Sequence, residues 1–106
     1  METIDAKELK KRLDAKDVTL IEVLSEEKYK EKHIKGAINI PLEKIATEAN
    51  KKFEKDDPIV VYCSDKDCTS SPTAAKKLKA SGFNNVYYFE GGKKAWEDAG
   101  YPMESN

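Results

Sequence analysis

The sequence has few of the residues that build metal centres, membrane spans or nucleic-acid surfaces. It holds two cysteines and one histidine, and because a zinc site needs about four ligands, we expect no metal. No apolar run approaches the roughly 18 residues that a membrane-spanning helix requires. The 19 basic and 20 acidic side chains leave a net charge of −1, which gives no electrostatic basis for binding nucleic acid or an anionic membrane.

The first residues, Met-Glu-Thr-Ile-Asp-Ala-Lys, are not a signal peptide. We therefore expect a cytoplasmic protein, and the reducing conditions there argue against a structural disulfide. Cys63 and Cys68 are also too close in the sequence to tie distant parts of a fold together, so both are predicted to be thiols. The length suits one modest core, and without repeats or linkers residues 1–106 are predicted to form a single domain.

One stretch places a thiol between a strand and a helix. Residues 59–62, Ile-Val-Val-Tyr, form a continuous apolar run typical of a strand buried on both faces. Cys63 follows where this strand ends. A helix is expected to begin with Ser71 as N-cap and Pro72 in the first position, and to end at Gly82. The unpaired N–H groups and partial positive charge of a helix start favour both a thiolate and an anion bound beside it.

Predicted strands and helices alternate along the rest of the chain. Further strands are expected at residues 18–23, 37–40 and 86–89, helices at 5–13, 25–32, 42–53 and 93–99, and a turn at 33–36. This order predicts an α/β fold with a mostly parallel central sheet of about five short strands and helices on both faces. Ligands bind such sheets beyond the carboxyl ends of the strands, where Cys63 lies.

Four motifs in a fixed order, spread over nearly the whole chain, resemble the single-domain rhodanese family. They are His33-Ile-Lys-Gly-Ala-Ile-Asn-Ile-Pro41, Tyr62-Cys63, the Ala74-Ala75 helix up to Gly82-Phe83, and Gly91-Gly92 followed by Trp96, Ala99, Gly100, Tyr101 and Pro102. The resemblance implies a rhodanese-like fold and a sulfurtransferase. The Cys63 thiolate would attack a donor's outer sulfur, become a persulfide, and pass that sulfur to a thiophilic acceptor such as cyanide or another thiol.

This reaction requires neither a metal nor an organic cofactor. The partners it implies are a small sulfur donor or a protein persulfide on one side and a thiol acceptor on the other; the oligomeric state is not predicted. Backbone N–H groups of residues 64–70 would form a cradle for the anionic outer sulfur. The candidate substrate-binding loop consists of Ser64, Asp65, Lys66, Asp67, Cys68, Thr69, Ser70 and Ser71.

The loop departs from the family pattern in ways that affect the expected substrate. It is longer than usual and has neither a glycine nor the usual arginine, near whose place Ser70 falls. Asp65 and Asp67 outweigh Lys66, so the rim of the cradle is net negative. Like-charge repulsion then disfavours both the thiolate and a doubly charged donor. Thiosulfate is therefore predicted to be a poor donor, compared with a protein persulfide, a polysulfide or a thiol species of low charge.

Two interpretations of Cys68 are open. It is a loop thiol without a role, or it resolves a Cys63 persulfide by forming a reversible disulfide and releasing sulfide. Two rival functions accompany them. One is a non-catalytic sulfur-binding or redox-sensing module that uses Cys63 and Cys68. The other, less favoured, is a phosphatase-like variant of the fold, which would need an arginine to clamp the phosphoryl oxygens.

The stretch Glu22-Val23-Leu24 stands where family members commonly have Asp-Val-Arg. The arginine and its ion pairs are therefore missing. The resemblance gives His33 a structural place beside the acidic residue of this strand. Glu22 and His33 are accordingly predicted to form a polar contact that holds the fold together, and Trp96 is interpreted either as core or as part of the pocket lining.

Overall fold

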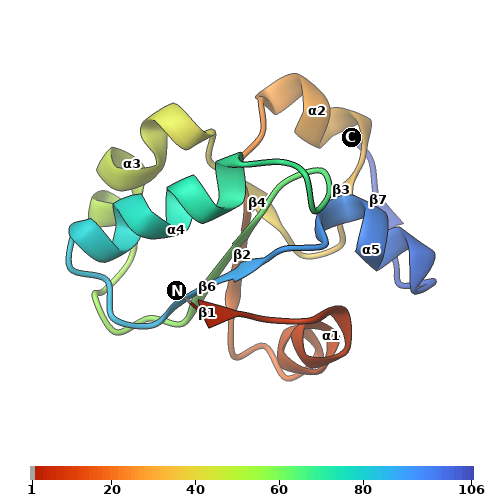
Figure 1. Ribbon diagram of the computed structural model, residues 1–106, viewed down its shortest axis with the longest axis horizontal. Coiled ribbons are helices and arrows are strands. Elements are labelled where there is room, and N and C mark those ends of the chain that lie inside the picture. Colours follow the sequence, from red (N-terminus) through yellow and green to blue (C-terminus); the bar gives the residue numbers. More distant parts are fainter. Residues whose placement is uncertain (1) are drawn as a thin grey trace.

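A five-stranded sheet forms the centre of the protein in the computed structural model, which describes residues 2–106 (Figure 1). Its strands are β1 (Glu2–Thr3), β2 (Thr19–Glu22), β4 (Ile38–Asn39), β5 (Ile59–Tyr62) and β6 (Val86–Phe89). They lie in the order β1-β6-β5-β2-β4, and every neighbouring pair is parallel. The predicted α/β class and parallel five-stranded sheet are confirmed, with the apolar run of β5 at the centre.

Helices cover both faces of this sheet. They are α1 (Ala6–Asp14), α2 (Glu26–Glu31), α3 (Ile45–Lys52), α4 (Ser70–Ala80) and α5 (Gly92–Asp98), with a short 3-10 helix η1 (Leu42–Lys44) before α3. In Figure 1, α3 and α4 lie on one side of the sheet and α1 lies on the other. No helix in residues 2–106 is both long enough and apolar enough to cross a membrane.

Two hydrophobic cores result, one on each face. The α3–α4 core contains Ile45 and Ala49 of α3 and Ala74, Ala75 and Leu78 of α4, together with Ile59, Val61 and Cys63. The α1–α5 core contains Leu9 of α1 and Trp96 of α5, together with Val60 and Tyr62. Successive residues of β5 thus enter opposite cores, as strand geometry requires. Tyr62 therefore points away from Cys63, and Trp96 is a core residue at 1% exposure.

Helix α4 begins two residues earlier than predicted. Thr69, not Ser71, precedes its first residue, and the predicted N-cap is wrong because Ser71 is buried within the first turn. Pro72 is tolerated there because the first amides of a helix have no intrahelical partner. The predicted end is confirmed: Gly82 has a φ of +97°, and the N–H of Phe83 donates to the Leu78 carbonyl at 3.1 Å.

A second, two-stranded sheet was not predicted. Strand β3 (His33–Ile34) pairs antiparallel with β7 (Met103–Glu104) near the end of the chain. The turn predicted at residues 33–36 is therefore wrong in its first half, because β3 becomes a strand only through a partner far away in the sequence. Gly36, with a φ of +95°, makes the turn that follows.

Candidate active site

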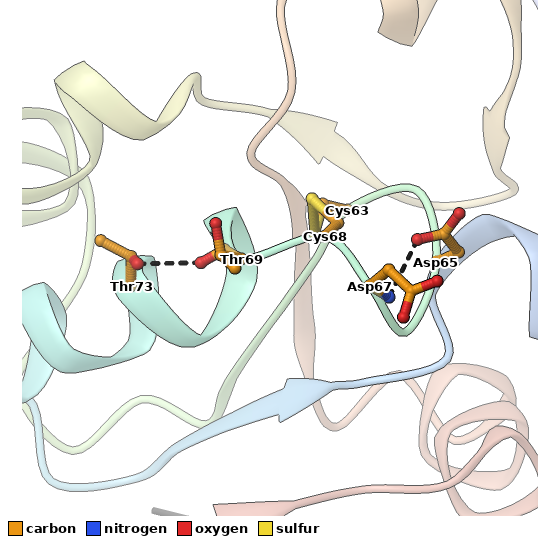
Figure 2. Close-up of a disulfide and its surroundings, with 6 residues drawn as sticks. All are labelled: Cys63, Asp65, Asp67, Cys68, Thr69 and Thr73. Atoms are coloured by element: carbon orange, nitrogen blue, oxygen red, sulfur yellow. Dashed lines mark hydrogen bonds between the residues drawn. A yellow bond between two sulfur atoms is a disulfide. The ribbon is translucent and has the colours of Figure 1, made fainter.

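Cys63 lies at the carboxyl end of β5, the central strand. Cys63 is 1% exposed and packs in the α3–α4 core. Residues 63–69 connect β5 to the first residue of α4. The Thr73 hydroxyl donates to the Thr69 carbonyl at 2.8 Å and closes the first turn of this helix (Figure 2). The predicted order of strand, cysteine and helix is thus present.

The two cysteines are joined by a disulfide, with their Cα atoms 6.4 Å apart (Figure 2). The prediction that both are thiols is wrong for this state of the protein. The bond joins residues only five positions apart, so it closes a local loop and links no distant elements. Cys68 is half-buried, and because its sulfur is bonded to that of Cys63, it covers part of the Cys63 sulfur.

An aspartate turn brings Cys68 back to Cys63. The Asp65 carboxylate accepts a hydrogen bond from the Asp67 N–H at 3.0 Å, and the Asp65 carbonyl accepts one from the Cys68 N–H at 3.2 Å. Aspartate favours such turns because its side chain can bond to the backbone two residues later. The chain therefore reverses direction between the cysteines.

Helix α5 supports the base of the loop. Its Lys93 and Lys94 N–H groups donate to the carbonyls of Cys63 and Ser64, both at 3.0 Å. Gly92 precedes them with a φ of +61°, and a Cβ atom there would lie 2.5 Å from the Cys63 carbonyl oxygen. Only glycine permits this close approach. The Gly91-Gly92 motif therefore lets the start of α5 pack against the residue that carries the thiol.

Several loop amides have no acceptor. Within residues 2–106, the backbone N–H groups of Ser64, Asp65, Lys66 and Thr69 donate no hydrogen bond, while those of Asp67 and Cys68 are used in the turn. The start of α4 adds the partial positive charge of an eleven-residue helix. The loop therefore offers hydrogen-bond donors for an anion.

The loop carboxylates do not crowd the sulfur atoms. Asp65 and Asp67 line a cavity of about 280 Å³ that is completed by Lys66 and by residues of the α5 segment, and neither cysteine lines it. In Figure 2 the two aspartates lie at the far end of the loop from the disulfide. Their repulsion of a thiolate, predicted from the sequence, therefore acts over a longer distance than expected.

Glu22, the last residue of β2, is fully buried beside Tyr62 of β5 in a hydrogen-bonded cluster. The Tyr62 hydroxyl donates to Glu22 Oε1 at 2.7 Å and accepts from the Ile34 N–H at 3.1 Å. Glu22 Oε2 has no hydrogen-bond partner in the described chain and is balanced by the Lys93 ammonium 3.0 Å away. Burial raises the pKa of Glu22, and the Tyr62 hydroxyl and Lys93 oppose that rise. Burial and the Glu22 carboxylate also raise the pKa of Tyr62.

The predicted polar contact between Glu22 and His33 is not a direct hydrogen bond or ion pair, although His33 acts electrostatically on Glu22 and opposes the rise that burial causes in its pKa. His33 is also buried, but no hydrogen bond or ion pair joins it to Glu22 in the part of the chain described. Its Nδ1 lies 2.8 Å from the Tyr29 carbonyl oxygen, and its ring stacks on the Tyr29 ring at 3.8 Å. Lys93 takes the place beside Glu22 instead. This role of Lys93 is not among the sequence-based predictions, and its one signal in the sequence is its position directly after the glycine pair.

The chain matches the rhodanese-like domain over residues 5–99. It belongs to the rhodanese-like family. It is 32% identical over 94 residues to the thiosulfate sulfurtransferase GlpE of Coxiella burnetii, covering 89% of this chain and 82% of that protein. It is 34% identical over 103 residues to the HTH-type transcriptional regulator Rv0324 of Mycobacterium tuberculosis, covering 97% of this chain but only 45% of that protein.

A solved structure supports the same assignment. The crystal structure of the Alr3790 protein from Anabaena superposes with a TM-score of 0.89 at 32% identity, covering 96% of this chain and 80% of that one. The rhodanese-like fold predicted from the sequence motifs is therefore confirmed.

Within this rhodanese-like domain, the expected arginine position has become apolar. Leu24 packs against the α3–α4 core, next to the cluster that contains Cys63. The Asn39 amide fixes this segment by donating to the carbonyls of Glu22 and Leu24 at 3.0 and 2.9 Å. Leu24 thus adds hydrocarbon in place of a cation to the core that contains Cys63, and the polar donors come from the loop.

Proposed function

We propose that this rhodanese-like domain is a sulfurtransferase in which reduced Cys63 accepts a sulfane sulfur as a persulfide and passes it to a thiophilic acceptor. The observation that carries the proposal is the position of Cys63 at the carboxyl end of the central parallel strand, directly before a loop with unpaired amides and a helix start. Ligands of parallel α/β sheets bind at this edge. Relatives named thiosulfate sulfurtransferase support the same reaction.

The loop supplies what such a reaction needs. Attack on a donor requires the thiolate, which a helix start favours. The outer sulfur of the resulting persulfide is anionic, and the N–H groups of Ser64, Asp65, Lys66 and Thr69 have no other acceptor in residues 2–106. Such donors stabilise an anion without reorganisation. The partners are a small sulfur donor or a protein persulfide, and a thiol as acceptor.

Donor charge is the main determinant of substrate choice in this proposal. The loop between Cys63 and α4 holds two aspartates, one lysine and no arginine. No guanidinium is there to neutralise a dianion, and arginine forks are the groups best suited to such oxyanions. We infer that thiosulfate is a poor donor here, because the loop lacks a compensating cation and not because its carboxylates touch the sulfur.

Two sulfur donors that differ in charge test both parts of the proposal. The protein is reduced and freed of reductant, and thiocyanate formation from cyanide is measured with thiosulfate and with an aryl thiosulfonate, which carries a single negative charge. We expect transfer with both, a higher kcat/KM for the thiosulfonate, and loss of transfer in Cys63→Ser. Equal turnover of Cys63→Ser and the wild type would refute the function. Equal kcat/KM values for the two donors would refute only the charge argument.

The disulfide favours a second candidate, a redox-sensing module. In this case Cys63 and Cys68 would cycle between dithiol and disulfide without carrying sulfur. Thiocyanate formation from a sulfane-sulfur donor and cyanide separates the two functions. A sensor becomes oxidised but transfers nothing to cyanide, whereas the proposed enzyme forms thiocyanate repeatedly while reductant is supplied.

A further inference from the structure

We propose that Cys68 is a second catalytic residue, which resolves the Cys63 persulfide and releases its outer sulfur as hydrosulfide. This inference rests on the proposed function, because it begins with a sulfur loaded on Cys63. The acceptor of the sulfur is then the Cys68 thiol together with a dithiol reductant, whose electrons convert sulfane sulfur to sulfide. The Cys63–Cys68 disulfide is the intermediate between release of sulfide and reduction by the dithiol.

The resolving step balances without an outside oxidant. The Cys68 thiolate attacks the inner sulfur of protonated Cys63–S–SH. A bond forms between the two cysteine Sγ atoms, the bond from Cys63 Sγ to the outer sulfur breaks, and hydrosulfide leaves with the electron pair and its proton. In this step the outer sulfur gains one electron and the Cys68 sulfur loses one, while the oxidation state of the Cys63 sulfur is unchanged. The dithiol reductant then supplies two electrons and two protons, which restores both thiols.

The geometry supports attack at the inner sulfur. The structure places the Cys68 sulfur in a bond with Cys63 Sγ, which is the product of that attack. A relay of the outer sulfur to Cys68 would instead need the two cysteine sulfurs separated by a further atom. The Asp65 turn holds the chain reversal that brings the thiols together, through the bonds to the Asp67 and Cys68 amides. Closing so short a loop costs little entropy.

The position of Cys68 suits a nucleophile. It directly precedes Thr69, the residue before the first turn of α4, whose positive end favours a thiolate. Within residues 2–106, the Thr69 amide donates to no protein acceptor. The disulfide itself is the independent observation that this thiol reaches Cys63.

The two cysteine residues differ in exposure, and this difference decides which of them a reductant attacks. Cys63 is 1% exposed, whereas Cys68 is half-buried. Thiol–disulfide exchange depends on which sulfur the attacking thiolate can reach. A reductant would therefore bond to Cys68 first and free Cys63. The reductant's own second thiol would then release Cys68, which is why a dithiol should act faster than a monothiol.

A single-turnover experiment under anaerobic conditions tests the inference. Reduced wild-type protein, freed of reductant, is mixed with an aryl thiosulfonate, whose leaving group is a sulfinate and not sulfide. Released sulfide is measured, and the protein is alkylated and its mass determined intact and after digestion. We expect stoichiometric sulfide and a Cys63–Cys68 disulfide in the wild type. In Cys68→Ser we expect an added sulfur on Cys63, no sulfide, and discharge to cyanide.

The two cysteine variants form a matched pair, since each removes the disulfide and leaves one thiol. A wild type that keeps a stable persulfide, or releases no more sulfide than Cys68→Ser, would overturn the resolving role while the sulfurtransferase stands. Sulfur mapped to Cys68 would also overturn it, in favour of a relay. Undiminished loading of Cys63→Ser would overturn the proposed function itself. Should Cys68→Ser not fold, disulfide formation coupled to sulfide release in the wild type still decides the question.

Discussion

Alternate residues of strand β5 point into two cores that use polar groups differently. Val61 and Cys63 enter the α3–α4 core, which Glu22 and His33, the buried residues of charged type in residues 2–106, do not enter. Tyr62 enters the opposite core, where its hydroxyl contacts the buried Glu22 carboxylate. His33, the other buried ionisable residue in the described chain, stacks on Tyr29 of that same core. Buried charge is therefore kept on the face away from the thiol.

The two faces nevertheless meet at Lys93. Its side chain neutralises Glu22 on the polar face, and its backbone N–H holds the Cys63 carbonyl at the end of the strand. The ion pair between Lys93 and Glu22 thus fixes the residue that holds the base of the loop. The donors that would face a bound sulfur are backbone amides. This division keeps a carboxylate away from the thiolate, which like charge would disfavour.

Removing Lys93 should give the largest loss of stability. Lys93→Met leaves the Glu22 carboxylate buried without a cation, and we expect the free energy of unfolding at neutral pH to fall by about 3–5 kcal/mol. Urea denaturation followed by circular dichroism measures this change. Glu22→Gln is the matched control, because in that background the loss of Lys93 should cost much less. An equal cost in both backgrounds would show that Lys93 acts by packing alone.

The same variant should make stability more dependent on pH. Burial raises the pKa of Glu22 in the folded protein, so its stability cost grows as the pH rises from about 4.5, the ordinary value, through the raised pKa. Loss of Lys93 raises that pKa further. The stability difference between wild type and Lys93→Met should therefore shrink as the pH falls below the pKa of Glu22 in the folded wild type, where the carboxyl is protonated in both folded proteins. A difference that stays constant with pH contradicts the ion pair.

Removing the Tyr62 hydroxyl should have a smaller effect on the same face. Tyr62→Phe takes a donor from Glu22 Oε1 and an acceptor from the Ile34 N–H, both buried, and we expect a loss of about 1–3 kcal/mol. Tyr88→Phe is the control, since the half-buried Tyr88 hydroxyl makes no hydrogen bond within residues 2–106. Thermal or urea unfolding of both variants should show a loss only for the first.

Local patterns of the sequence revealed β5, Cys63 and the end of α4, because each depends on neighbouring residues: an apolar run, its end, and a glycine. They did not reveal β1 or the β3–β7 pair, whose two-residue strands exist only through distant partners. Three candidate N-caps in succession, Thr69, Ser70 and Ser71, explain the error of two residues at the start of α4.

In the candidate site, too, features set by neighbouring residues could be predicted, and features set by distant residues could not. Cys63 follows from its place at the strand end, whereas the direction of the Asp65 and Asp67 side chains depends on how the loop turns. The pairing of Glu22 with Lys93 joins residues of β2 and α5, and no local spacing connects them. The return of Cys68 to Cys63 likewise depends on the Asp65 turn, whose hydrogen bonds were not predicted from the sequence.

Reduction of the Cys63–Cys68 disulfide tests how much this bond contributes to stability at the end of β5 that enters the α3–α4 core. The bond closes a short loop, so in the chain-entropy account it stabilises the fold by about 2 kcal/mol or less. Urea unfolding of the wild type with and without a dithiol should show a difference within this limit. The reductant should have no effect on Cys68→Ser, which has no disulfide to lose. A larger effect in the wild type would mean that the disulfide supports more than the loop.

The smallest predicted effect lies in the middle of the α3–α4 core. Ile45 of α3 is fully buried among apolar side chains, so Ile45→Val removes one methylene and should cost about 0.5–1.5 kcal/mol. No ionisable group is involved, so the cost should be the same near pH 4.5 and at neutral pH, in contrast to Lys93→Met. Urea unfolding at both pH values makes the comparison. If the Ile45→Val cost varied with pH as that of Lys93→Met does, the pH dependence would belong to the whole fold and not to the polar face of β5.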